Sequence, residues 1–424
     1  MSNISLTKDI FGPLEVPADR LVGVYSPNRP DHPGLTDEEL RDRLRHPIGT
    51  APLAEMARGA DRVLIVTDDN TRQTPLSRLL PMIVDELARA GVPESGIEFL
   101  IGLGTHRAMT EEEIRQKFGE EIPRRFPVVN HAWSDPNSLV SLGSSGLGFE
   151  VLVNRAVLET DFLVTVGSII PHATAGFSGG PKSIMPGICG EVTIEATHWA
   201  ALDYEMYEIL GNFDNRIRKA AVSVCRQVEH CFMVNTIMVD ENSVYDMVAG
   251  DVEVAHRAGC ERSLDVYGVP VESKADVVVA EAYPTDIDLR QAIKAICAAD
   301  IVCKDNGVVI LPAECWEGVS PQFPDFVRLG FREPDELYWK VESGDERQKL
   351  LAYTLVAIGR IICKRLKGIL VSSHIGEEEA KRMGFLWAPS LQAAVDLGLE
   401  IAGPGSVVVV LREAGEMLPL VSAL

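Results

Sequence analysis

Three histidines and one lysine have the residue types and surroundings for chemistry. His106 lies in the segment LGTHRAMT, and His172 precedes the glycine-rich segment GFSGGPKS, which contains Lys182; His198 follows further along the chain. Imidazoles exchange protons near neutral pH or bind soft metals, and glycines let a ligand approach the backbone closely. These residues predict acid/base or metal chemistry close to a lysine, although a histidine taken singly is more often structural.

The glycine-rich segment departs from the phosphate-binding loop that it superficially matches. Pro181 separates Gly180 from Lys182, whereas that loop needs Gly directly before Lys, and proline also removes an N–H donor. Two interpretations remain open: a tight turn with a solvated lysine, or a nucleophilic or covalently attached lysine. The segment GLGTHR (102–107) also fails as a dinucleotide-binding fingerprint, because its sixth residue is Arg107.

Each of these segments follows a predicted strand. Continuous apolar runs predict buried strands at 62–67, 97–102 and 162–167. The carboxyl ends of parallel strands meet at one edge of a sheet, so the three following loops are expected to converge on one pocket. The first loop contains Asp69 and Arg72, which either pair with each other, contact a nucleotide or form an ordinary turn.

A second group of polar residues predicts an anion site. Arg290, Gln291 and Lys294 share one face of a predicted helix, close to its positively polarised N-terminus. Asp286 or Asp288 is expected to cap that helix. The chain carries a net charge of −22, so any anion site must be built locally. The alternatives are a solvated helix face, or an Arg290 that pairs with an acid such as Asp286.

Strands that alternate with helices predict an α/β fold with two domains and parallel-type sheets. The first domain is expected to span residues 1–268 and the second 276–404, with the boundary in the polar segment 265–276. Runs such as VVVAEA (277–282) supply the strands of the second domain. The last apolar run, SVVVVLR (406–412), suits a strand of either domain.

The composition excludes several classes of protein. With 62 acidic and 40 basic residues the chain should repel nucleic acid. The eight cysteines form no C-x-x-C pair, which argues against a zinc ribbon. A basic, apolar leader and an apolar run long enough for a membrane helix are both absent from the sequence. We therefore expect a cytoplasmic enzyme without a membrane or nucleic-acid partner.

Taken together, the motifs resemble a known family. DDNTRQTP (68–75), GTHR (104–107), PHATAGFSGGPKSIMPG (171–187) and His198 occur in the order and spacing of the nickel-dependent lactate racemase family, the nickel-pincer-nucleotide 2-hydroxyacid racemases and epimerases. The resemblance spans most of the chain, including 286–294. It implies two α/β domains with an interdomain active-site cleft, and a C-terminal segment, 405–424, that returns to the first domain.

The resemblance also implies a cofactor. This is a nickel-pincer nucleotide, in which a pyridinium-3,5-bisthiocarboxylic acid mononucleotide holds nickel through two sulfurs and a carbon. Lys182 matches the lysine that attaches it through a thioamide, and His198 matches the remaining nickel ligand. Asp69 and Arg72 match residues that line the cofactor site. Partners would then be a small hydroxyacid and the proteins that build the cofactor, while the oligomeric state stays open.

The implied reaction removes a hydride from a 2-hydroxyacid and returns it to either face of the planar ketoacid. His106 and His172 match the two acid/base residues, and Gln291 and Lys294 match the residues that hold the substrate carboxylate. Arg290 stands where the lactate enzyme has a tyrosine, which favours a second anionic group on the substrate, as in malate. The alternatives are lactate itself, an NAD-dependent 2-hydroxyacid dehydrogenase, or a non-catalytic nucleotide-binding or nickel-storage protein, against which both histidines argue.

Overall fold

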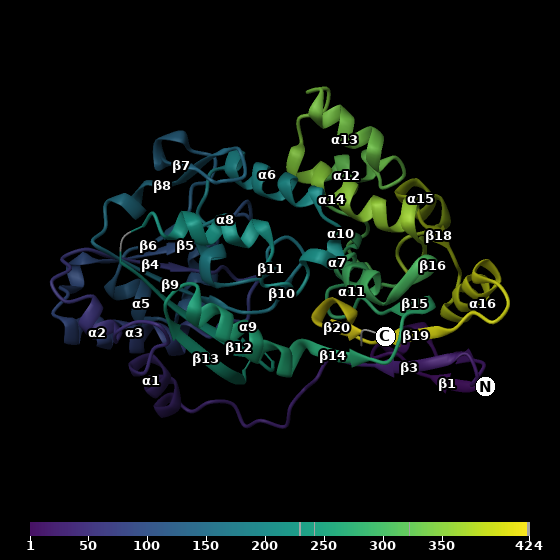
Figure 1. Ribbon diagram of the computed structural model, residues 1–424, viewed down its shortest axis with the longest axis horizontal. Helices are drawn as coiled ribbons and strands as arrows, with labels where there is room; N and C mark the ends of the chain where they lie inside the picture. Colours follow the sequence, from purple (N-terminus) through teal and green to yellow (C-terminus); the bar gives the residue numbers. More distant parts are fainter. Residues whose placement is uncertain (229, 241, 322, 422–424) are drawn as a thin grey trace. The chain divides into compact units, whose positions relative to one another are not determined.

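The computed structural model describes residues 1–228, 230–240, 242–321 and 323–421. The chain divides into two units, each with its own sheet (Figure 1). The last change of unit, between Val266 and Tyr267, falls within the polar segment where a boundary is predicted. Unit 1 comprises Met1–Asn28, Leu202–Leu210 and Tyr267–Leu424, and unit 2 comprises Arg29–Ala201 and Gly211–Val266.

Unit 2 is built on a six-stranded sheet in the order β13-β12-β9-β4-β5-β6. Its strands run parallel except for the antiparallel pair of β12 and β13. The predicted strands at 62–67, 97–102 and 162–167 are confirmed, and β4 and β9 are buried along their whole length. The strands are β4 (Val63–Thr67), β5 (Ile97–Ile101), β6 (Val128–Asn130), β9 (Phe162–Ser168), β12 (Cys231–Met238) and β13 (Val244–Gly250).

The helices of unit 2 begin and end where local signals place them. Helix α3 (Leu76–Ala90) ends at Gly91 in the left-handed conformation, and Thr110 with Glu113 forms a capping box at the start of α4 (Glu111–Phe118). Leu87 belongs to the apolar core on one face of the sheet. The other elements of the unit are α1 (Asp37–Arg45), α2 (Leu53–Met56), α5 (Glu121–Arg125), β7 (Leu139–Ser144), β8 (Glu150–Asn154), β10 (Pro171–His172), β11 (Gly176–Phe177), the 3-10 helix η5 (Gly180–Ser183), α6 (Glu191–Ala200), α8 (Arg216–Cys225) and α9 (Val254–Tyr267).

Unit 1 is built on a second six-stranded sheet, in the order β18-β17-β16-β15-β19-β3, with every neighbouring pair parallel. Its strands are β3 (Leu21–Tyr25), β15 (Ala275–Ala280), β16 (Cys303–Pro312), β17 (Lys367–Val371), β18 (Leu386–Trp387) and β19 (Val408–Leu411). The further elements are β1 (Ser2–Ile4), β2 (Leu14–Val16), α7 (Met206–Ile209), β14 (Gly268–Val271), α10 (Leu289–Ala292), α11 (Lys294–Val302), α12 (Pro324–Leu329), α13 (Pro334–Glu342), α14 (Lys349–Gly359), α15 (Glu377–Met383), α16 (Leu391–Ala402) and β20 (Leu418–Val421).

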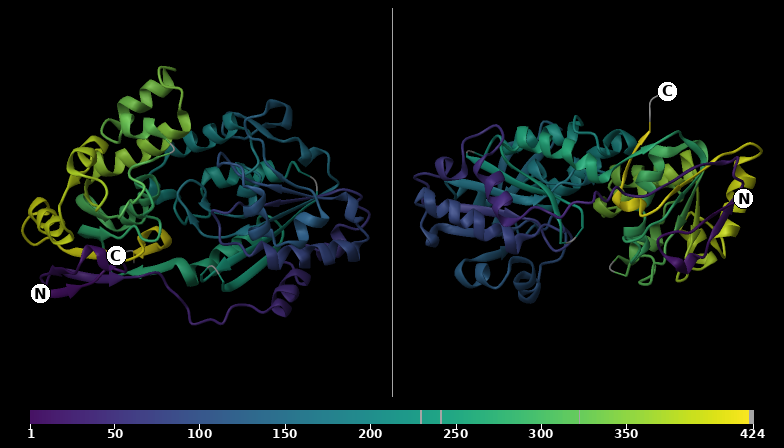
Figure 2. Two further views of the ribbon diagram at one scale, coloured as in Figure 1. Left: turned by 180° about the vertical axis from the view of Figure 1, so that it is seen from behind. Right: turned by 90° about the horizontal axis from the view of Figure 1, so that it is seen from below.

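Two expectations about the domains are wrong, and both concern the chain ends. The segment 405–424, as far as it is described (to Val421), does not return to the first domain: β19 lies between β15 and β3, and β20 pairs with β14. Residues 1–28 belong to unit 1, not to a domain spanning 1–268, because β3 completes the same sheet. The first described segment of the chain and the last, which ends at Val421, therefore both belong to unit 1 (Figure 2). A short apolar strand can join any parallel sheet, so its sequence does not specify which strands it pairs with.

None of the helices in the described residues combines the length and the apolar character that crossing a bilayer requires.

Candidate active site

The three loops predicted to converge do so at the carboxyl edge of the unit 2 sheet. Strand β4 lies between β9 and β5, and all three run parallel. The main-chain N–H of Gly102 donates to Thr67 O at 2.8 Å, which joins the loops after β5 and β4. The main-chain N–H of Gly104 donates to Gly187 O at 2.9 Å, and this bond joins the His106 loop to the segment after Lys182.

His106 is bonded to the Asp69 carboxylate. The distance from His106 Nδ1 to Asp69 Oδ2 is 2.6 Å, and the backbone and hydroxyl of Thr71 donate to Oδ1 at 3.0 and 2.5 Å. Burial alone would raise the pKa of Asp69, but the bonds from His106 and Thr71 and the charge of His106 lower it to about 2. Asp69 is therefore a carboxylate, so His106 holds a proton on Nδ1, and in the neutral ring the lone pair is on Nε2.

In His172, unlike His106, Nδ1 accepts hydrogen bonds. Its Nδ1 accepts the main-chain N–H groups of Thr174 and Ala175 at 3.2 and 3.3 Å, within the hairpin that β10 forms with β11. A ring nitrogen that accepts hydrogen bonds carries no proton, so neutral His172 has its proton on Nε2. His106 can thus accept a proton at Nε2, whereas His172 presents an N–H donor there.

Lys182 lies half-buried in η5. Its amine forms no hydrogen bond or ion pair with any residue that the structure describes. Burial and the charge of Arg72 lower the pKa of Lys182 to about 8, against the opposing effects of Asp69 and Asp68. Partial burial and the lowered pKa favour the nucleophilic interpretation of Lys182 over that of a solvated lysine. Asp69 does not pair with Arg72, because its carboxylate oxygens bind His106 and Thr71.

Two titratable residues extend this cluster. Asp68 Oδ2 accepts from the Thr74 hydroxyl at 2.5 Å, and burial raises the pKa of Asp68 to about 6. Lys117, from α4, donates to Arg72 O, and burial lowers its pKa. Sequence reasoning missed Lys117, because nothing in a charged helix distinguishes it from an exposed lysine.

His198 has the environment of a metal ligand. Its Nδ1 donates to Ile194 O at 2.8 Å, one turn back in α6, so the neutral ring carries its lone pair on Nε2. Burial, together with the charges of Lys182 and His106, lowers the pKa of His198 to about 4, although the Ile194 bond opposes this. Within the described residues no group of three His, Cys, Asp or Glu side chains could hold a metal. A metal at His198 would therefore need most of its ligands from a cofactor, which is what a sulfur and carbon pincer provides.

The predicted carboxylate-binding residues lie in unit 1, whereas the histidines and Lys182 lie in unit 2. Arg290 and Gln291 are in α10 and Lys294 begins α11, and Ile293 between them keeps a helical backbone. Of the two expected caps, Asp288 is the one used: its Oδ1 accepts from Gln291 N at 2.7 Å.

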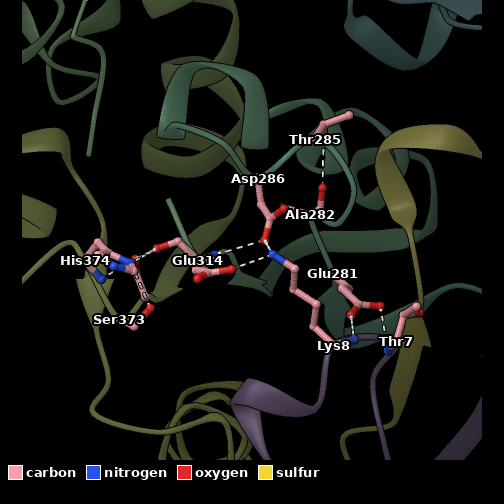
Figure 3. A network of polar contacts seen from close by, with 10 residues as sticks. Thr7, Lys8, Glu281, Ala282, Thr285, Asp286, Glu314, Ser373 and His374 are labelled. Atoms are coloured by element: carbon pink, nitrogen blue, oxygen red, sulfur yellow. Dashed lines mark hydrogen bonds and ion pairs between the residues drawn. The ribbon is translucent and has the colours of Figure 1, made fainter. Parts of the chain in front are cut away.

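Arg290 does not pair with Asp286. Asp286 is 1% exposed and binds Lys8 Nζ at 3.1 Å, while Lys8 also contacts Glu314 at 2.5 Å (Figure 3). The Arg290 guanidinium carbon lies 4.6 Å from the centroid of the Phe323 ring. Burial lowers the pKa of Arg290, against the charge of Asp288. Among the described residues Arg290 has no ion pair, so its charge is available to a ligand.

Comparison with known proteins places this site in a family. The profile of the lactate racemase N-terminal domain matches residues 10–208, and that of the lactate racemase C-terminal domain matches 271–416. The lactate racemase of Lactiplantibacillus plantarum is 32% identical over 290 residues, which cover 68% of each chain. That of Thermoanaerobacterium thermosaccharolyticum is 29% identical over 417 residues, or 94% of this chain and 96% of its own.

Solved structures agree with this assignment. The lactate racemase apoprotein from Thermoanaerobacterium thermosaccharolyticum matches with a TM-score of 0.87 and 27% identity, over 99% of this chain and 100% of that chain. A Thermotoga maritima protein shares the fold, with a TM-score of 0.69 and 21% identity over 94% of this chain and 100% of its own. The fold and the matches define a two-domain α/β isomerase that acts as a racemase. The chain belongs to the lactate racemase family.

The depressed pKa of Lys182 can be tested on the purified chain. Acetylation by an amine-directed reagent, followed by peptide mass spectrometry across pH, should give a midpoint near 8. The variant Arg72→Gln should raise this midpoint, because it removes a cation that disfavours the ammonium form. Arg78→Gln, which removes a cation paired with Asp37 instead, should leave it unchanged. A midpoint near the ordinary lysine value of about 10.4 would contradict the described environment.

Proposed function

We propose that this chain racemises lactate or a closely related 2-hydroxyacid, using a nickel-pincer nucleotide attached to Lys182. The observation that carries the proposal is the lysine amine with a pKa of about 8, which shares its surroundings with the neutral His198 imidazole and the Asp69-anchored His106. Lactate is favoured as the substrate because both similar relatives and the similar solved structure are named lactate racemase.

The residues present fit this cofactor. Lys182 supplies an amine that can form a thioamide, His198 supplies one neutral imidazole for nickel, and Asp69 and Arg72 line the site. When bound, the cofactor supplies the hydride acceptor and donor. Partners in this proposal are the proteins that synthesise the cofactor, together with the small hydroxyacid.

The proton steps follow from the two histidines. His106, held by Asp69, accepts the substrate hydroxyl proton at Nε2 as the carbon loses a hydride, which leaves a planar 2-ketoacid. His172 donates a hydrogen bond from its Nε2 to the same oxygen function. To act as the base for the opposite enantiomer, its ring would have to carry the proton on Nδ1 instead, which gives up the bonds from Thr174 and Ala175. Gln291 and Lys294 would hold the carboxylate. Hydride and proton both return to the substrate, so the net reaction is an inversion without oxidation.

A diacid such as malate is the second candidate substrate. The predicted competing pair of Arg290 with Asp286 is absent, and the Arg290 guanidinium lies half-buried over Phe323. A guanidinium in that state could bind a second carboxylate through two parallel hydrogen bonds. Gln291 and Lys294 would meanwhile bind the carboxylate next to the reacting carbon.

Cofactor attachment is tested by producing the chain alongside the cofactor-building enzymes. The intact mass of the parent should show a covalent adduct, and metal analysis should show nickel. Lys182→Ala should lose the adduct. His198→Ala should keep the adduct but bind less nickel, because it lacks only the metal ligand. A Lys182→Ala protein that kept both adduct and nickel would rule out this attachment.

The role of Asp69 is tested by Asp69→Asn. An amide N–H facing His106 Nδ1 would force the ring proton onto Nε2 and remove the base, so kcat should fall by about 10²–10⁴-fold. The loss should appear from either enantiomer, as should that of His106→Ala or His172→Ala. Rates are followed by chiral chromatography, and Asp37→Asn, on the surface, is the control. An Asp69→Asn enzyme as fast as the parent would refute this proton pathway.

Substrate choice is tested by comparing lactate and malate in the parent and in Arg290→Tyr. If Arg290 clamps a second carboxylate, the parent should turn over malate, and the variant should lose about 10–150-fold in kcat/KM on malate alone. Equal losses on both substrates would eliminate the clamp. If the parent does not turn over malate, both the clamp and malate as a substrate are eliminated, and lactate remains.

A further inference from the structure

A buried arginine and a buried histidine pack next to the turn that contains Lys182. Arg218 in α8 is 3% exposed, and His256 in α9 is 1% exposed. Arg218 Nη2 donates to His256 Nδ1 at 3.2 Å, and His256 Nε2 donates to the main-chain oxygen of Ser178 at 2.8 Å. These bonds need a neutral ring with its proton on Nε2. Burial and the charge of Arg218 lower the pKa of His256 to about 3, so the ring stays neutral.

The His256 ring also packs directly against the backbone of the turn. A Cβ added to Gly180 would lie 2.5 Å from His256 Cγ, and one added to Gly179 would lie 2.6 Å from Asn235 Oδ1. Both glycines have positive φ angles, 72° for Gly179 and 52° for Gly180. The N–H of Gly180 donates to Asn235 Oδ1 at 2.7 Å. The turn is therefore held between His256 on one side and Asn235 on the other.

Residues at and just before the start of α8 also form hydrogen bonds with the His172 hairpin. Asn215 caps this helix, since its Oδ1 accepts from Arg218 N at 2.8 Å. Its Nδ2 donates to Ala175 O at 3.2 Å, and the N–H of Gly211 donates to Gly176 O at 3.0 Å. One segment, 211–218, thus contacts the His172 hairpin directly and reaches the Lys182 turn through His256.

Stability alone does not account for Arg218. Its guanidinium carbon lies 3.3 Å from the centroid of the Phe213 ring, and its Nε has no hydrogen-bond partner in the described residues. No carboxylate of the described residues forms an ion pair with it. A buried charge without an acidic partner costs free energy, and an apolar side chain would avoid that cost.

We propose that Asn215, Arg218 and His256 form a clamp that positions the His172 hairpin and the Lys182 turn relative to each other. The proposal rests on the roles proposed above for His172 and Lys182. The three clamp residues are positioning residues, because they act through main-chain atoms of the two loops. The neutral His256 ring transmits the position of Arg218 to Ser178 without changing its protonation across the working pH range.

Hydrogen exchange of the full-length, cofactor-free chain tests the clamp itself. His256→Leu removes both bonds of the ring, so amides in 176–187 should exchange at least about tenfold faster, the change expected for one lost hydrogen bond. His256→Gln, whose amide can donate to Ser178 O, should restore slow exchange. Asn215→Ala should instead accelerate exchange in 171–177. Leu87→Ala, a core truncation on α3, controls for general destabilisation and should not change these peptides selectively.

Kinetics of the cofactor-loaded enzyme test whether the position matters. In His256→Leu, kcat should fall by up to about 10²-fold while KM changes little, because the carboxylate-binding residues lie in unit 1. His256→Gln should recover most of kcat, and Leu87→Ala should keep it. Exchange in 176–187 no faster than in Leu87→Ala, or an undiminished kcat in His256→Leu, would overturn the clamp. A parent without racemase activity would refute the proposed function, while the exchange data would still decide whether the clamp exists.

Discussion

Lys182 is partly buried near the carboxyl edge of a parallel sheet, and the chemistry of the candidate site depends on that placement. Burial and Arg72 favour the neutral amine, whereas Asp69 and Asp68 limit the shift, so the pKa stays near 8. The turn can approach this edge only because Gly179 and Gly180 lack side chains. An amine with a pKa of about 8 has a much larger neutral fraction near neutral pH than a solvated lysine, and it is therefore the better nucleophile for acylation.

The histidines around this lysine differ in the group that contacts Nδ1, and this group determines which ring nitrogen carries the proton. A carboxylate holds a proton on Nδ1 of His106, backbone N–H groups keep the proton off Nδ1 of His172, and a helical carbonyl accepts the Nδ1 proton of His198. Three copies of one side chain thereby differ in which ring nitrogen carries the proton, as the proposed roles of base, hydrogen-bond donor and metal ligand require. Residues that react with neither substrate nor cofactor therefore decide what each imidazole can do.

Unit 1 contains a cluster of acidic side chains close to the predicted anion site. Glu281, Asp286 and Glu314 gather near the carboxyl ends of β15 and β16, where an anionic substrate would be repelled. The N-terminal segment offsets this charge: the backbone N–H groups of Thr7 and Lys8 bind Glu281, and the Lys8 amine binds the other two acids. With Asp286 engaged in this way, Arg290 has no acidic partner among the described residues, and an anion site becomes possible inside a strongly acidic chain.

The sequence by itself determined the α/β class, the strands β4, β5 and β9, the capping box at Thr110 and the family, because these depend on local patterns and on the motif around Lys182. It also determined that three loops converge, since parallel strands share one edge. Only the tertiary structure decided that β3 and β19 share the sheet of unit 1, that Asp286 binds Lys8, and that His256, which looks isolated in the sequence, supports the Lys182 turn. Those facts depend on contacts between residues far apart in the chain, and an apolar strand or a lone histidine carries no local signal of its partner.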